Sequence, residues 1–312
     1  MRIGILRGQG VTDIDQLTAD LADAQSAGFT SYWLPKVELQ ADSLIALAVA
    51  GSRVPGIELG AGIVPIWTQH PLALGQSALT AASVLGDRLA LGVGIVNKPV
   101  VEGTWGIPFE RPITVMREYV EILQSVLGNE VTHYDGELIS AHAAPVLPGV
   151  ARPPLYMAAL GPQMTRLAGK HSDGAILFLT GPITVKTHSR PLLSASAQAA
   201  CRPRPRVIVG VPVVCTDDVA RGRALIEQHY AWYGTAPHYR AMLDIEGANS
   251  PADVAIIGNE SAVKARLEAL FEAGADDVIC YELGSTLAEV ARTRACLAEI
   301  IARQPAIPDA IE

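Results

Sequence analysis

The chain of 312 residues is 49% hydrophobic and 18% charged, a composition typical of a compact globular protein rather than of a disordered chain or a coiled coil. Its 24 lysines and arginines are outnumbered by 32 aspartates and glutamates, which gives a formal net charge of -8. An acidic chain of this kind repels nucleic acid and anionic membranes, so neither is an expected partner. Length alone leaves one large domain or two small ones open.

The cysteines indicate a reducing environment, because they lie far apart and form neither a CxxC pair nor a metal-ligand spacing. The first residues do not resemble a signal peptide, and no later run approaches the ~18 apolar residues that a membrane span needs. We therefore expect a cytoplasmic protein. The cysteines are Cys201, Cys215, Cys280 and Cys296.

Short runs rich in isoleucine, valine and leucine alternate with segments of helical period, which is typical of parallel βα units. One helical stripe consists of Ile14, Leu17, Leu21 and Ala24. Because nearly every run is apolar on both faces, we expect a closed (β/α)8 TIM barrel, with a doubly wound sheet as the alternative. The strands are predicted at residues 3–6, 31–34, 57–64, 89–93, 155–158, 175–179, 207–214 and 278–281.

The spacing of these strands predicts two insertions within a single barrel domain, residues 1–312. The fifth and eighth strands follow their predecessors at about twice the usual interval. The first insertion, about 129–150, is expected to form two short strands joined by an Asp135-Gly136 turn. The second, about 234–253, carries no recognisable motif.

The active site of such a barrel lies at the carboxyl ends of the strands, so the segments that follow each run are the candidates. After the fifth run, Gly161 leads into a helix whose first amides have no internal partner, and free amides together with the helix dipole favour an anion. An ordinary βα turn explains the same residues. In the third run, Gly60 and Gly62 favour either a planar ligand above the backbone or tight packing inside the barrel.

Ionisable residues near the predicted strand ends form no pattern typical of hydrolysis or metal binding. His70 precedes a proline at a helix start and is expected to cap that helix, while His133 and His142 are expected to be exposed rather than to bind a metal. Trp33, Trp67 and Trp105 fit an apolar pocket for a ring. The ionisable residues are Lys36, Glu38, His70, Lys98, Glu102, Lys186, His188 and Arg190.

Four blocks of sequence, in this order, resemble the luciferase-like monooxygenase superfamily, and within it the oxidoreductases that depend on the deazaflavin coenzyme F420. The resemblance covers nearly the whole chain. It is carried by AGFTSYWL at 27–34, LGAGIV at 59–64 with His70-Pro71, ASVLGDRLALGVG at 82–94, and AALGP at 158–162 with Ala168-Gly169 and Asp173-Gly174.

The resemblance implies a (β/α)8 barrel that binds a flavin-type ring at the strand ends, and a homodimer. It also implies a non-proline cis peptide in the third strand, for which Gly62-Ile63 is the matching position, and ring contacts from Ile95 and Val96. The implied contacts to the phosphate and tail of the cofactor fall where the free amides favour an anion, on Ala159, Leu160, Gly161, Pro162 and Gln163.

The chain departs from the sugar-phosphate dehydrogenases of this branch. Those enzymes carry an Asp-His pair after the second strand and a glutamate after the fourth, but here the places read Pro35-Lys36 and Asn97-Lys98. We therefore expect a reductase of an activated C=C or C=N bond in a small organic substrate rather than an alcohol dehydrogenase. Its proton would come from Lys36, Glu38 or solvent.

Two other functions stay open at this point. An FMN-dependent monooxygenase of the same superfamily would fit the same blocks. A barrel without a cofactor, acting as a binding or structural subunit, would fit them too.

Overall fold

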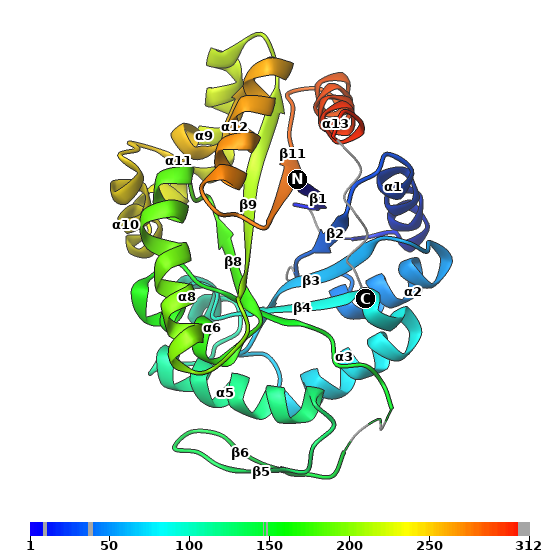
Figure 1. Cartoon of the computed structure of the whole chain (residues 1–312), viewed down its shortest axis with the longest axis vertical. Helices are drawn as coiled ribbons and strands as arrows, with labels where there is room; N and C mark the ends of the chain where they lie inside the picture. The colour runs from blue at the N-terminus through cyan, green and yellow to red at the C-terminus, as the bar shows by residue number, and fades with distance from the viewer. Residues whose placement is uncertain (9–10, 37–39, 146, 148, 305–312) are drawn as a thin grey trace.

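The computed structural model describes residues 1–8, 11–36, 40–145, 147 and 149–304, and its main sheet closes into a barrel of parallel strands (Figure 1). Each predicted strand is present within two residues of its expected limits. The (β/α)8 TIM barrel is confirmed, and the doubly wound sheet is wrong. In barrel order the strands are β1 Arg2–Leu6, β2 Ser31–Leu34, β3 Glu58–Pro65, β4 Leu89–Gly94, β7 Leu155–Ala158, β8 Gly174–Phe178, β9 Arg206–Cys215 and β11 Asp277–Glu282.

Helices surround the barrel, and their ends follow the predicted signals. Asp13 caps the first helix by accepting hydrogen bonds from the amides of Asp15 and Gln16, and Gly28, with φ of 84°, lets the chain turn into β2. The helices outside the second insertion are α1 Ile14–Ser26, α2 Ser43–Arg53, α3 Pro71–Leu85, α4 Lys98–Gly103, α5 Pro112–Leu127, α6 Pro162–His171, α7 Pro182–Thr184, α8 Arg190–Ala199, α12 Glu260–Glu272 and α13 Leu287–Ala302, with single turns at Gly86–Arg88 and Val185–Ser189.

The ninth strand closes the barrel and then leaves it. Its first residues, from Arg206 to Gly210, pair with β8, and β11 pairs along its other side. Further on, Val213 to Cys215 pair instead with the short strand β10 (Ile256–Gly258). The barrel wall is therefore extended by an added strand at the carboxyl end of β9.

The first insertion is the predicted hairpin, and it lies outside α5 (Figure 1). The buried carboxylate of Glu118 accepts hydrogen bonds from the amides of Glu137, Leu138 and Ile139 at 2.9–3.0 Å. A side chain at Gly136 would come within 2.5 Å of that carboxylate, so the turn needs glycine. Burial alone would raise the pKa of Glu118, but the three amides hold it below its ordinary value. The strands are β5 Thr132–Asp135 and β6 Ser140–Ala143.

The second insertion is longer than predicted. The strand spacing placed it at about 234–253, whereas the added segment begins with α9 and ends with β10. The first of its helices buries Gly222, Ile226 and Tyr230 at intervals of four, a stripe that an ordinary barrel helix shares, so the pattern does not mark it as added. The helices are α9 Val219–Thr235, α10 Pro237–Glu246 and α11 Pro251–Val254.

Charged side chains fill the barrel interior at the amino ends of the strands. The guanidinium of Arg206 binds Asp277 and Glu58 and donates to the Tyr156 hydroxyl at 3.1 Å. Arg2 binds the same two carboxylates at 2.9 and 3.1 Å. Asp277 is only 1% exposed, so its negative charge is stable in the interior only because the two arginines bind it. The cluster joins five strands across the interior.

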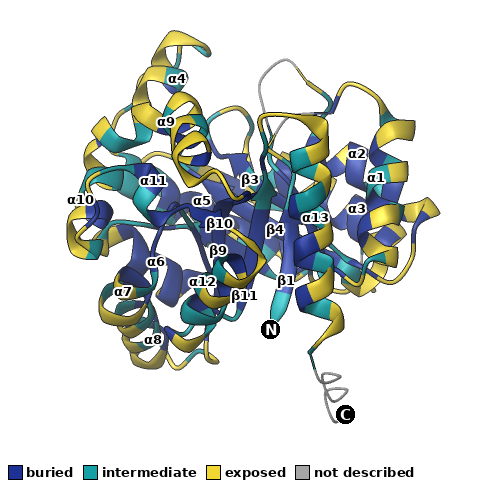
Figure 2. Ribbon diagram, turned by 90° about the horizontal axis from the view of Figure 1, so that it is seen from above, coloured by how far each residue is buried: buried dark blue, intermediate teal, exposed yellow. Residues whose placement is uncertain are grey.

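Burial follows the layers of the fold. The strands in the centre of Figure 2 are mostly buried, and the surrounding helices turn their exposed faces outward. In the part of the chain that the structure describes, no helix combines the length and apolar character that crossing a membrane requires.

Replacing Arg206 with methionine should lower the free energy of unfolding by about 3–5 kcal/mol, because it leaves two carboxylates inside the barrel with only Arg2 as partner. Urea unfolding followed by circular dichroism measures the change. Arg303→Met is the matched control, since its pair with Glu299 on α13 is exposed and should be worth less than about 1 kcal/mol. Equal losses in the two variants would show that the cluster contributes no more than a surface pair.

Candidate active site

The third strand is irregular near its carboxyl end. A non-proline cis peptide bond joins Gly62 to Ile63, the position that the family resemblance implies. Pairing with β4 shifts register between Ala61 and Val64, so the strand bulges at the same place. The bulge changes the direction of the β3 backbone near the carboxyl ends of the strands, which is where the active site of such a barrel lies.

Trp33 lies inside the barrel beneath this bulge and does not line a pocket at the strand ends as predicted. It is 1% exposed, and its indole N–H donates to the Ser31 hydroxyl at 3.1 Å. A side chain at Gly60 would meet the Trp33 ring at 2.1 Å, and one at Gly62 would meet it at 2.7 Å. Both glycines are therefore needed for packing against the indole. Of the two explanations considered for them, a planar ligand and tight packing inside the barrel, these contacts support the second.

Three predicted segments meet above Trp33. The side chain of Ile63 lies over Gly94, where an added side chain would come within 2.3 Å of its Cδ1 and within 3.1 Å of Ala158. The end of β4, the cis peptide of β3 and the end of β7 are therefore neighbours. Ile63 also packs on the interior cluster with Leu6 and Ile176, which makes this floor apolar.

The chain leaves β4 in an unusual conformation. Val96 has φ of 54°, which a β-branched residue rarely adopts, and its side chain is half-buried. The carbonyl oxygen of Ile95 accepts a hydrogen bond from the Trp67 indole at 2.6 Å. Trp67 also packs on Phe109, with ring centroids 5.2 Å apart. These contacts hold Ile95 and Val96 beside the bulge, and a backbone fixed in a rare conformation is typical of ligand-binding segments.

Lys36 follows β2, and its backbone binds the residue after the cis bond, Ile63. Its amide donates to the carbonyl oxygen of Ile63 at 3.2 Å, while its ammonium lies 2.9 Å from a carboxylate oxygen of Asp42. Asp42 also accepts from the first amides of α2. The predicted proton donor is thus next to the bulge but paired with a carboxylate. The other predicted donor, Glu38, lies outside the described residues.

The segment after β7 carries free amides, as the sequence predicts. The helix α6 begins at Pro162 with Gly161 as its N-cap, and no side chain caps it. Gln163 is exposed and Leu160 and Gly161 are half-exposed, whereas Ala159 is buried and its amide donates to the carbonyl oxygen of Ile176. First-turn amides without a protein acceptor attract an anion, and here they adjoin the apolar floor.

The chain that forms this site is similar to known proteins along most of its length. A family model described as luciferase-like monooxygenase matches residues 1–277. The chain belongs to the luciferase-like monooxygenase family. It is 25% identical over 181 residues to the 5,10-methylenetetrahydromethanopterin reductase of Methanolobus tindarius, covering 58% of this chain and 55% of that one. The chain therefore spans about half the length of the first reductases it matches.

A longer match within the family is a putative coenzyme F420-dependent oxidoreductase of Mycobacterium tuberculosis, 29% identical over 253 residues, covering 75% of this chain and 72% of that one. The F420-dependent tetrahydromethanopterin reductase of Methanopyrus kandleri superposes with a TM-score of 0.73 at 19% identity, covering 96% of each chain. A type II Baeyer-Villiger monooxygenase of Pseudomonas putida in complex with FMN reaches 0.76 at 18%, covering 99% of each. At these identities the two structures show the shared fold alone.

In this luciferase-like barrel the second insertion brings an aromatic group to the strand ends that sequence reasoning missed. Tyr230 and Tyr233 of α9 lie 5.9 and 5.7 Å from the ring of Phe178 at the end of β8, and Tyr281 of β11 lies 6.3 Å from Tyr230. Burial raises the pKa of Tyr233 and of Tyr281, so their hydroxyl groups stay protonated and can donate hydrogen bonds. The ring of Tyr239 packs on that of Tyr233 and extends this aromatic group. The spacing of tyrosines in α9 is the one signal that could have indicated this group.

Two charged residues of the luciferase-like barrel have structural roles outside the candidate site. Arg190, predicted near the active site, instead binds Asp276 and the carbonyl oxygen of Gly274 at the amino end of β11. Glu282 ends β11, and burial raises its pKa, but its carboxylate pairs with Arg294 of α13 on the outside of the barrel. Neither side chain takes part in the candidate site.

A surface hollow between α12 and α13 lies away from the candidate site. Its lining includes four glutamates, which do not suit an anionic ligand. We therefore place the candidate site at the bulge of β3, where apolar floor and free amides adjoin. The glutamates are Glu260, Glu268, Glu272 and Glu299.

Gly62→Ala should lower the free energy of unfolding by about 1–3 kcal/mol, because the new methyl group displaces the buried Trp33 ring. Urea unfolding measures the loss, and tryptophan fluorescence reports the altered indole environment. Gly161→Ala is the control: its φ is -71° and nothing lies within 4 Å of the added carbon, so stability should hold. A Gly62→Ala protein as stable as the wild type would contradict the packing role of Gly62.

Proposed function

We propose that the chain is a coenzyme F420-dependent oxidoreductase that exchanges a hydride between the deazaflavin and a small organic substrate. The observation that carries the proposal is the bulge at Gly62-Ile63, which lies beside the ends of β4 and β7 in a chain that matches a relative named for this coenzyme. When bound, a reduced deazaflavin supplies the hydride. The protein supplies binding, orientation and a proton.

The described residues fit such a cofactor. The apolar floor of Leu6, Ile63 and Ile176 suits one face of a ring system. The half-buried Ile95 and Val96 would contact it from β4. The uncapped amino end of α6 within the predicted segment Ala159 to Gln163 suits its phosphate through the amides of Leu160, Gly161 and Gln163, since Ala159 donates to Ile176 and Pro162 has no N–H. These amides and the helix dipole bind an anion where net charge does not.

We infer further that the reaction is the reduction of an activated C=C or C=N bond rather than alcohol oxidation. Alcohol oxidation needs a group that accepts the hydroxyl proton, but Lys36 is paired with Asp42, and Lys98 pairs with Glu102 on the exposed α4. In a reduction the hydride reaches one atom of the double bond and a proton the other. The ammonium of Lys36, which follows β2 beside Ile63, is our proposed proton source; Glu38 and solvent are the other predicted sources.

An FMN-dependent monooxygenase is the second candidate, favoured by the family match and by the fold shared with the FMN-bound enzyme of Pseudomonas putida. Such an enzyme would consume dioxygen and need a reductase partner. A barrel without any cofactor, serving as a binding or structural subunit, is the third. The homodimer and the cytoplasmic location expected from the sequence stay predictions.

The protein should bind coenzyme F420 more tightly than FMN, and should oxidise reduced F420 only when an electron-poor alkene or imine is supplied. Parallel titrations measure both affinities, and absorbance under nitrogen follows the oxidation. Lys36→Met should slow turnover while the F420 affinity stays unchanged, because its backbone contact to Ile63 remains. If the protein prefers FMN and takes up oxygen, it is a monooxygenase instead. If it binds neither cofactor, the third candidate, a binding or structural subunit without a cofactor, is supported.

Gln163→Glu should weaken F420 binding by about three- to tenfold, because it places a negative charge at the amide group that we assign to the cofactor phosphate. Gln163→Lys should strengthen binding by a similar factor. The glutamate also favours the amino end of a helix, so a loss cannot come from unfolding of α6. Gln198→Glu, exposed on α8, is the matched control. If both glutamate variants bind F420 alike, the phosphate does not lie at α6.

A further inference from the structure

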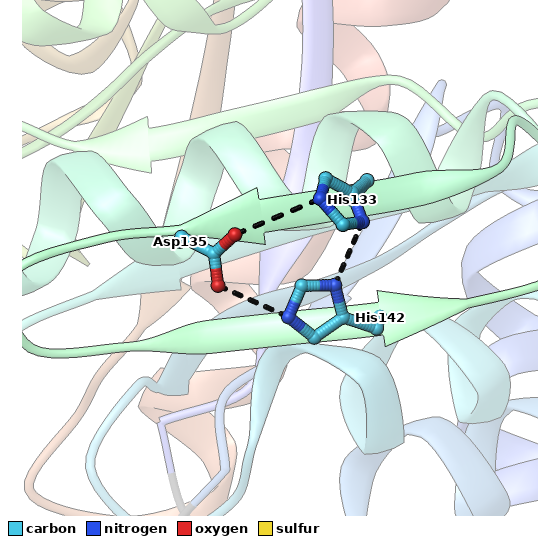
Figure 3. Close-up of side chains that lie close together, drawn as sticks. All are labelled: His133, Asp135 and His142. Atoms are coloured by element: carbon cyan, nitrogen blue, oxygen red, sulfur yellow. Dashed lines mark hydrogen bonds and ion pairs between the residues drawn. The ribbon is translucent and has the colours of Figure 1, made fainter.

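The hairpin of the first insertion brings three metal-binding side chains together on one face. His133 of β5 lies directly opposite His142 of β6, and Asp135 follows two residues after His133. Side chains at i and i+2 of a strand point to the same side, so the aspartate joins the two imidazoles (Figure 3). One ligand atom from each of the three residues can be chosen so that the three atoms lie within 4.8 Å of one another.

The three residues contact one another. His133 Nδ1 lies 2.9 Å from His142 Nδ1, and the Asp135 oxygens lie 3.1 Å from His142 Nε2 and 3.6 Å from His133 Nε2. These contacts use different nitrogens of each ring, so an ion would take one nitrogen from each imidazole. Ligands bound tetrahedrally at about 2.0–2.1 Å are about 3.3–3.4 Å apart, so small rotations of these exposed side chains place one donor atom of each on an ion. Two imidazoles with one carboxylate are a ligand set that Zn²⁺ and similar transition-metal ions prefer over Mg²⁺ or Ca²⁺.

The group is accessible and has no competing cation. The side chains of His133, Asp135 and His142 are 78%, 67% and 49% exposed, which leaves room for water on an ion. In the described part of the chain, no lysine or arginine pairs with Asp135. The carboxylate is therefore free to neutralise a bound cation.

The scaffold beneath the group is fixed before any ion binds. The opposite face of the hairpin is turned to the protein, where Ala141 is buried and the Tyr134 hydroxyl donates to Glu121. The turn is held by the buried carboxylate of Glu118. At the other side, His70 contacts the carbonyl oxygen of Ser140 at 3.2 Å. A ligand set held in place loses little conformational freedom on binding.

We propose that His133, Asp135 and His142 bind one divalent transition-metal ion, with Zn²⁺ as the best match and water completing its coordination. The ion links β5 to β6 on the outside of α5, so the site is separate from the candidate active site. From the sequence alone, the two histidines were expected to be exposed and not to bind a metal. Exposure is correct, and only the strand register reveals that the histidines face each other.

Tag-free protein, stripped of metal, should bind one Zn²⁺ per chain in a competition titration with a chromophoric chelator. Co²⁺ in its place should give the visible absorption of a nitrogen- and oxygen-bound ion. His133→Ala and His142→Ala should each weaken binding by more than the roughly 10–100-fold that loss of an outer-shell partner costs. His229→Ala and His238→Ala, exposed histidines of the second insertion, should bind as the wild type does.

Hydrogen exchange gives a second readout that does not depend on affinity. Saturating Zn²⁺ should slow amide exchange in residues 132–143 of the wild type and leave the His133→Ala/His142→Ala variant unchanged. Circular dichroism checks that this double variant is folded. Wild-type protein that holds Zn²⁺ no more tightly than the double variant would overturn the proposal.

Discussion

The neutral ion cluster inside the barrel is the constraint on which the other features rest. Arg2 and Arg206 carry two positive charges, Glu58 and Asp277 carry two negative ones, and together they close the amino ends of the strands. Because the charges balance there, the layer above can be mostly apolar. Trp33 is the largest side chain in that layer, and its size forces glycine at two positions of β3. The irregular end of that strand thus lies on a packed base.

This arrangement separates what the amino-acid sequence predicts from what it does not. Strands such as β1 and β4 could be located because runs apolar on both faces leave few alternatives, and α1 could be located from its cap and stripe. The ion cluster could not, because Arg2 and Arg206 are 204 positions apart and look like ordinary charged residues at strand starts. Pairing across a closed barrel depends on register and shear, which a pattern of single runs does not contain.

The candidate site shows the same limit on a smaller scale. The amides before α6 were predictable, since a glycine between a strand and a helix leaves them free whatever surrounds it. The role of Gly62 was not decided, because a ligand and a buried indole demand the same small residue. The tyrosines of α9 were missed because Tyr230 continues the four-residue stripe of Gly222 and Ile226, which is equally typical of a helix that packs on a barrel. Most of α9 lies before residue 234, where the second insertion was predicted to begin. The spacing of its buried residues does not show whether the helix belongs to the barrel or to the insertion.

The departure of β9 from β8 has an evolutionary consequence. Since Val213 to Cys215 pair with β10 instead, everything between α9 and β10 is attached to one side of the barrel only. The bulge of β3, the end of β4 and the start of α6 belong to the other side. Mutations in the added helices can therefore be selected for a new substrate while the half that would hold the cofactor drifts little. Paralogues built on this scaffold would then differ in substrate specificity and share the same redox cofactor.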